Sequence, residues 1–142
     1  MKSKFSQVVR VKKQTLDRIE ARLVSARAKV ANLELNAKAL RAKLDEISMP
    51  QSGKMSELKQ NLELLRIMRD ELDDIKERLE LSKKEVMHVE HQYKNANLDF
   101  EKIKYLEQED FKREIKRQKH LEAVTLDEFA IMNFGTKGVI SE

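Results

Sequence analysis

One segment carries the residue types best suited to chemistry. Glu85 and His88 form a Glu-x-x-His pair, and His91 follows about one helical turn later. On a helix this spacing places a carboxylate and an imidazole on the same face, as in the di-iron sites of four-helix bundles. Such a site also needs a second Glu-x-x-His and further inward-facing glutamates, and neither is evident in the sequence. We therefore expect a solvated pair of histidines, with no bound metal and no cofactor.

Other signatures of catalysis are missing from the sequence, which contains no Gly-rich phosphate loop, no nucleophile elbow and no HExxH. The lack of cysteine excludes disulfides and thiolate metal sites, and fits a reducing compartment such as the cytoplasm. No apolar run approaches the roughly 18 to 20 residues that cross a membrane, and the basic start is not followed by the apolar core of a signal peptide. A cytoplasmic protein that is not an enzyme, and that works by binding other proteins, is expected.

The composition indicates long, uninterrupted helices. The 142-residue chain is 38% charged but contains only 3 Gly and 1 Pro, so it lacks the turn residues that a globular domain with many elements needs. Aromatic residues make up just 5% of the chain, which is too few for a broad core. The hydrophobic surface is therefore expected to be a narrow seam.

A coiled-coil pattern occupies the first third of the chain, where apolar residues recur at steps that alternate between four and three. The seam positions are Phe5, Val9, Lys12, Leu16, Ile19, Leu23, Ala26, Val30, Leu33, Ala37, Leu40, Leu44 and Ile47. Only Lys12 among them is polar. This pattern predicts a helix over about residues 5–47, about 65 Å long at 1.5 Å per residue.

A turn and a second helix follow. Pro50 removes a helical donor and Gly53 allows a sharp reversal, so we expect the hairpin turn at residues 48–54. The second seam consists of Met55, Leu58, Leu62 and Leu65, followed by Met68, Leu72, Ile75, Leu79, Ser82, Val86, Val89, Tyr93, Ala96, Phe100 and Ile103. The extra three-residue step from Leu65 to Met68 is a stammer, which should overwind the coil locally.

Together the two seams predict an all-α fold: a long two-helix antiparallel coiled-coil hairpin with a C-terminal helical overhang. If the turn is short, Phe5 faces Leu98 and Phe100. Charge agrees with antiparallel pairing, because residues 1–43 carry twelve basic and three acidic side chains, whereas residues 57–80 carry eight acidic and five basic ones. The whole chain is expected to form a single coiled-coil unit.

The overhang comprises residues 104–133, which have no partner in the first helix. The second helix is expected to span about residues 55–133. Thr125 and Glu128 have the spacing of a capping box, so this helix either breaks near Thr125 or carries the threonine in mid-helix. Residues 134–142 have loop composition and are expected to fray.

Two surfaces of the predicted hairpin are candidates for partner binding. Basic residues gather at its open end, namely Arg10, Lys12 and Lys13 with Lys112, Arg113, Lys116 and Arg117. They form either a solvated helix face or a site for an acidic protein surface, while a net charge of +4 with interleaved acids makes nucleic acid a weaker target. Apolar residues off the seam, Leu35, Leu64 and Ile67, are predicted to form a docking patch on the distal half.

The sequence resembles the FliJ family of the bacterial flagellar type III export apparatus, and the similarity covers nearly the whole chain. The resemblance rests on the start Phe5-Ser6-Gln7-Val8-Val9-Arg10-Val11-Lys12-Lys13, on Phe111-Lys112-Arg113-Glu114, and on Glu122-Ala123-Val124-Thr125-Leu126-Asp127-Glu128-Phe129-Ala130. A basic helix that ends in a Leu-Asp-Glu motif followed by an apolar pair is typical of that family.

The resemblance implies an antiparallel coiled coil similar to the stalk of rotary ATPases, without ATPase activity of its own. It implies insertion into the hexameric ring of the export ATPase FliI, contact with the export gate protein FlhA, and escort of export chaperones. Such a protein would be cytoplasmic and peripherally associated with the inner-membrane export apparatus. Two other hypotheses remain: a nucleic-acid-associated coiled coil that uses the same basic residues, and a structural spacer that self-associates through the unpaired segment 104–133.

Overall fold

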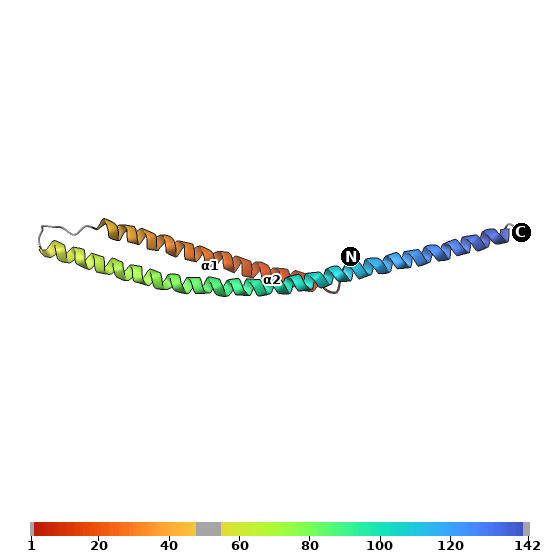
Figure 1. The fold of residues 1–142 in the computed structure, drawn as a ribbon, viewed down its shortest axis with the longest axis horizontal. Coiled ribbons are helices and arrows are strands. Elements are labelled where there is room, and N and C mark those ends of the chain that lie inside the picture. The colour runs from red at the N-terminus through yellow and green to blue at the C-terminus, as the bar shows by residue number, and fades with distance from the viewer. Residues whose placement is uncertain (1, 48–54, 141–142) are drawn as a thin grey trace. The chain divides into compact units, whose positions relative to one another are not determined.

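The structure, a computed structural model, describes residues 2–47 and 55–140, with the backbone alone for residues 135–140. It contains two helices, α1 (Ser6–Glu46) and α2 (Met55–Ile140), and the described residues include no strand (Figure 1). The predicted all-α helical hairpin is therefore confirmed. The turn expected at residues 48–54 lies outside the described residues.

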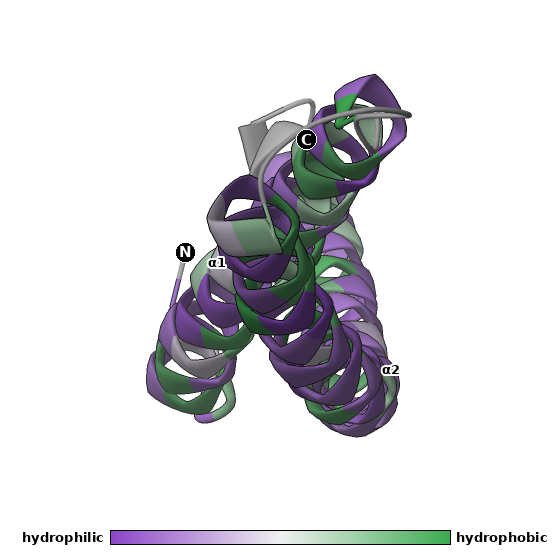
Figure 2. Ribbon diagram, turned by 90° about the vertical axis from the view of Figure 1, so that its left-hand side faces the viewer, coloured by the Kyte–Doolittle hydropathy of each residue, from purple (hydrophilic) through white to green (hydrophobic). Residues whose placement is uncertain are grey.

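The chain divides into two compact units, and both helices contribute to each of them. The first unit combines residues 1–14 with 98–142, and the second comprises residues 15–97. Hydrophobic segments alternate with hydrophilic ones on both helices (Figure 2), which fits a seam that covers only part of each helix surface. The expectation that the chain acts as a single coiled-coil unit stays a prediction.

In the second unit the seam is a true core. Its largest buried cluster joins Ala37 and Leu40 of α1 to Met68 and Leu72 of α2. Leu44, Ile47 and Ile75 pack against this cluster and are partly buried. Ala37 is the only small side chain among these seven, and the larger ones fill the space between the two helices.

The seam of α1 lies where its pattern places it. All thirteen positions from Phe5 to Ile47 are buried or half-buried, Lys12 included, while every other residue of α1 except Ser6 is exposed. A residue step of 3.5 keeps one face toward the partner helix along the full length of α1. The apolar spacing alone was therefore sufficient to identify the packed face.

The predicted seam of α2 is wrong at its start. Leu62 is 50% exposed and Met55 is also exposed, whereas Asn61 is half-buried. With Asn61 in the seam, Leu58, Asn61, Leu65 and Met68 follow the same alternating steps of three and four as the rest of α2. No stammer is needed, because a polar residue takes the seam position that hydrophobicity had assigned to Leu62.

Ion pairs between the helices establish the antiparallel arrangement and correct its predicted register. In the second unit Arg27 pairs with Glu90 at 3.1 Å, and Lys29 pairs with Glu85 at 3.9 Å. In the first unit Lys12 lies 4.0 Å from Asp99, where Phe5 had been expected. The real register is thus displaced by roughly nine residues, or about two and a half helical turns. The error came from assuming a short turn, which would place the end of α1 directly opposite the start of α2.

The helix α2 is continuous through Thr125 and ends seven residues later than expected, at Ile140. The Thr125 hydroxyl donates a hydrogen bond of 2.8 Å to the carbonyl oxygen of Leu121, one turn earlier. The hydroxyl is thereby satisfied within the helix, so Thr125 sits in mid-helix and does not start a new one. All the side chains from Ile115 to Phe134 are exposed, as expected of an overhang.

Candidate protein-binding surfaces

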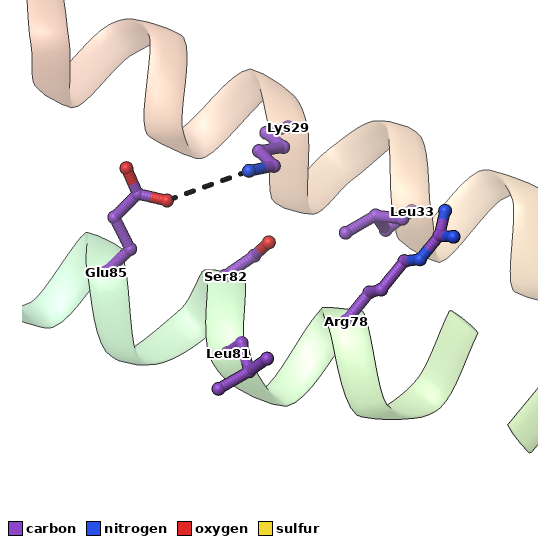
Figure 3. A pocket seen from close by; sticks show the side chains of 6 residues that line it. All are labelled: Lys29, Leu33, Arg78, Leu81, Ser82 and Glu85. Atoms are coloured by element: carbon purple, nitrogen blue, oxygen red, sulfur yellow. Dashed lines mark ion pairs between the residues drawn. The ribbon is translucent and has the colours of Figure 1, made fainter. Parts of the chain in front are cut away.

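Glu85, His88 and His91, which first suggested chemistry, each contact a neighbouring polar side chain in the structure. His88 and His91 each lie within hydrogen-bonding distance of an amide one turn later, at 3.2 Å from Gln92 and 3.3 Å from Asn95. Glu85 turns toward α1 and pairs with Lys29 (Figure 3). Over residues 2–47 and 55–140, no group of three or more His, Cys, Asp or Glu is arranged to hold a metal ion.

The hollow beside this pair is a shallow groove between the helices of the second unit. It has a volume of about 370 Å³ and is lined by Lys29, Leu33, Arg78, Leu81, Ser82 and Glu85 (Figure 3). Ser82 is a seam residue and is only 4% exposed. A small side chain at a position that usually holds leucine leaves the groove open. Its lining residues include no buried pair of reactive groups.

Two of the basic residues of α1 contact side chains of α2. The Lys12 ammonium reaches Asp99, and the Lys13 ammonium lies 5.6 Å from the centre of the Phe100 ring. Both contacts hold the start of α1 on α2 and leave less of each side chain for a partner. Arg10 is exposed and borders a small hollow beside Ser6.

The basic residues of α2 lie on the overhang. Lys112 pairs with Glu109 at 3.4 Å and Arg117 with Glu114 at 2.9 Å, each within one turn of the same helix. Arg113 and Lys116 are exposed and have no ion-pair partner among the residues that the structure describes. An exposed lysine or arginine keeps most of its charge available to a partner when no acid neutralises it.

The two basic groups belong to the same unit but not to one patch. Lys112 lies thirteen residues beyond Asp99, the partner of Lys12, which is about 20 Å along the helix. Where the seam of α2 continues along this stretch, its positions hold three half-buried acidic residues, Glu107, Asp110 and Glu114, and Glu109 beside them is half-buried as well. The Asp110 carboxylate accepts a hydrogen bond from the Ser3 hydroxyl. Sequence reasoning missed this acidic stretch because it followed apolar residues only.

The predicted apolar patch is smaller than expected. Leu64 and Ile67 are both nearly half exposed, and each directly precedes a seam residue, so they lie on the same side of α2. Leu35 is 65% exposed and lies two positions after its seam residue, on the outer face of α1. Its neighbour Glu34 pairs with Lys83, which puts Leu35 at least about 15 Å from Ile67 along the axis. Leu35 is therefore not part of the patch.

A larger apolar surface escaped the sequence reasoning. Beyond the basic residues the overhang exposes Leu121, Val124, Phe129, Ile131 and Met132. Their spacing groups them on one broad face of the helix, since residues three, four and seven apart lie side by side. Because α2 is continuous through Thr125, these residues share one helix face, while Leu126 and Phe134, which are also exposed, lie toward the opposite side.

No described helix is both long and apolar enough to cross a membrane. No curated protein and no solved structure matches the chain. The model of one protein family, described as FliJ, the flagellar FliJ protein, matches residues 1–138. This match spans nearly all of the 142 residues and agrees with a fold of two long helices packed against each other. The chain therefore belongs to the FliJ family and is a protein related to flagellar protein export.

Proposed function

We propose that this protein is a non-enzymatic stalk that couples the flagellar export ATPase to the export gate and assists export chaperones. The overhang and the start of α1 bind the ring of the ATPase FliI, and the distal part of the hairpin binds the gate protein FlhA. The observation that carries the proposal is the family match over residues 1–138, on a chain whose helical overhang presents exposed cations.

Charge and geometry support the ring-binding part. A single helix fits a narrow central channel better than a helix pair does, so the overhang would enter the ring as a monomer, and from Ile115 to Phe134 all the described side chains of α2 are exposed. Arg10, Arg113 and Lys116 are the cations best placed to meet acidic side chains of a ring, because no carboxylate among the described residues pairs with them. Exposed charges of this kind mainly speed association and set orientation.

The gate-binding part rests on Leu64 and Ile67. Both expose nearly half of their surface on one side of α2, close to its start at Met55. Two neighbouring aliphatic side chains can act as a small anchor for a hydrophobic pocket on a partner, surrounded by polar residues that exclude water. Glu63 and Arg66, which pair with each other beside them, would form part of that rim.

The ring-binding part is tested by a triple variant, Arg10→Glu, Arg113→Glu and Lys116→Glu. Co-purification with the export ATPase of the same organism, and ATP turnover by that ATPase at physiological salt, should fall together, with affinity reduced about 10- to 100-fold. The matched control, Arg41→Glu, Arg69→Glu and Lys84→Glu, changes the net charge equally at exposed positions of the second unit. Equal binding by both variants would refute the proposed ring site.

The gate-binding part is tested by Leu64→Asp with Ile67→Asp, which should abolish capture of FlhA. The control is Val24→Asp with Met87→Asp, two residues that are more exposed and lie elsewhere on the second unit. Leu35→Asp, made separately, should bind FlhA normally because Leu35 lies outside the patch. Normal binding by the Leu64 and Ile67 variant would remove the gate assignment while leaving the ring assignment intact.

A further inference from the structure

The overhang is an exposed helix with unequal ends. Its first half carries the basic residues Lys112, Arg113, Lys116, Arg117, Lys119 and His120. Its second half carries Glu122, Asp127 and Glu128 and contains no lysine or arginine before residue 135. Between and beside the charges lies the apolar face that includes Leu121 and Val124. A helix with this pattern is complementary to a second copy of itself that runs in the opposite direction.

From these features we propose that two copies of the protein pair through residues 112–134 of α2, as an antiparallel two-helix coil with a two-fold axis. The occupant of the exposed apolar face is thus the same face of a second chain, in a state that excludes ring binding because both use the overhang. The contact is isologous, because each copy gives its basic half to the acidic half of the other.

The register follows from continuing the seam of α2. Beyond Ile103 the alternating steps reach Glu107, Asp110 and Glu114, then Arg117, Leu121, Val124 and Glu128. When Leu121 faces Val124 of the second copy, the next layer on either side brings Arg117 against Glu128. The centre of the coil is therefore two apolar layers, and an ion pair closes each end. No other register of this seam puts both the aliphatic pair and the opposite charges in contact.

Ion pairs between α1 and α2 in the second unit show which residues beside the seam can pair across the proposed dimer. Lys29 and Glu85 each precede a seam residue and meet at 3.9 Å across the coil. His120 and Asp127 also each lie one residue before a seam residue, and so share one side of the coil as Lys29 and Glu85 do, which lets them pair between copies. Arg27 and Glu90 each follow a seam residue and meet at 3.1 Å on the other side. Thr125 follows Val124 in the same way, and in the dimer it lies on the same side of the coil as Thr125 of the second copy.

Cross-linking tests the arrangement, because the chain has no cysteine. In this register the two copies of residue 125 are about 7.5 Å apart along the axis, which is too far for a direct disulfide, so Thr125→Cys should be joined into a dimer of the full chain by a short bis-maleimide reagent. Ile131→Cys lies in the seam, and its two copies are about 25 Å apart in the proposed register, so it should not cross-link. A parallel coil in register would instead bring the two copies of Ile131→Cys together. Cross-linking of Ile131→Cys without Thr125→Cys would overturn the proposal.

Sedimentation equilibrium of the full chain tests the charge pattern. The mass of the unmodified protein should rise with concentration from 16.7 kDa toward twice that value. Arg117→Glu should keep the chain monomeric at least tenfold higher in concentration, and adding Glu128→Arg should restore dimers. Leu121→Asp should also prevent association, whereas Val24→Asp, at an exposed position of α1, should not. A mass of one chain at all concentrations, or dimers that survive Leu121→Asp, would overturn the proposal.

Discussion

Ser82 interrupts the hydrophobic seam, and replacing it with leucine should stabilise the protein. The side chain is 4% exposed and lies beside Leu33 in the groove of about 370 Å³. Ser82→Leu replaces one oxygen with three carbons, and each fully buried carbon contributes about 0.8 kcal/mol. Full burial would give about 2.4 kcal/mol. Because the groove is open to solvent on one side, we expect about 1 to 2 kcal/mol.

The assay is chemical unfolding followed by circular dichroism of the helices. The midpoint of unfolding should rise at an unchanged dependence on denaturant, and Tm should rise by about 5 °C. Ser25→Leu, the same substitution at an exposed position of α1, is the control and should leave stability unchanged within about 0.5 kcal/mol. If Ser82→Leu raises the free energy of unfolding no more than the control does, or lowers it, then the seam has no room for a larger side chain at this position and the prediction is wrong.

Two further predictions concern the seam. Val89→Ala should lower the free energy of unfolding by about 2 kcal/mol, since Val89 is 2% exposed and loses two buried methyl groups, whereas a loss below about 0.5 kcal/mol in denaturant unfolding would contradict its place in the core. Asn61→Leu should raise Tm, because residue 61 lies in the seam, and Leu62→Asn should leave Tm nearly unchanged. If thermal unfolding shows instead that Leu62→Asn lowers Tm and Asn61→Leu has no effect, Leu62 is the seam residue and the stammer is real.

The sequence was most informative where its pattern was long. Thirteen consecutive seam positions located the packed face of α1, because a helix allows only one face to meet a single partner. At the start of α2 the pattern was short, and Leu62 competed with Asn61 for one position. Hydrophobicity favoured the leucine, but helical geometry carries the seam through Asn61 and turns the leucine outward.

The register could not be predicted because nothing local specifies it. Sliding one heptad seam along another keeps apolar residues in contact, so the position is decided by details such as Lys12 with Asp99 and Arg27 with Glu90. The error also shifted the expected patch, since Leu35 had been placed opposite Met68. The basic residues were identified from their spacing, but only the structure shows that several of them pair with neighbouring acidic residues.

The end of the seam affects how the first unit opens. Where leucines would continue, α2 presents Glu107 and Asp110 to the start of α1, and a hydrogen bond from Ser3 takes the place of apolar packing. Few buried contacts mean a low free energy of local opening, so the amides in the first turns of α1 should exchange with solvent faster than those beside Leu40. A partner can then displace the start of α1 from α2 without unfolding the rest of the helix.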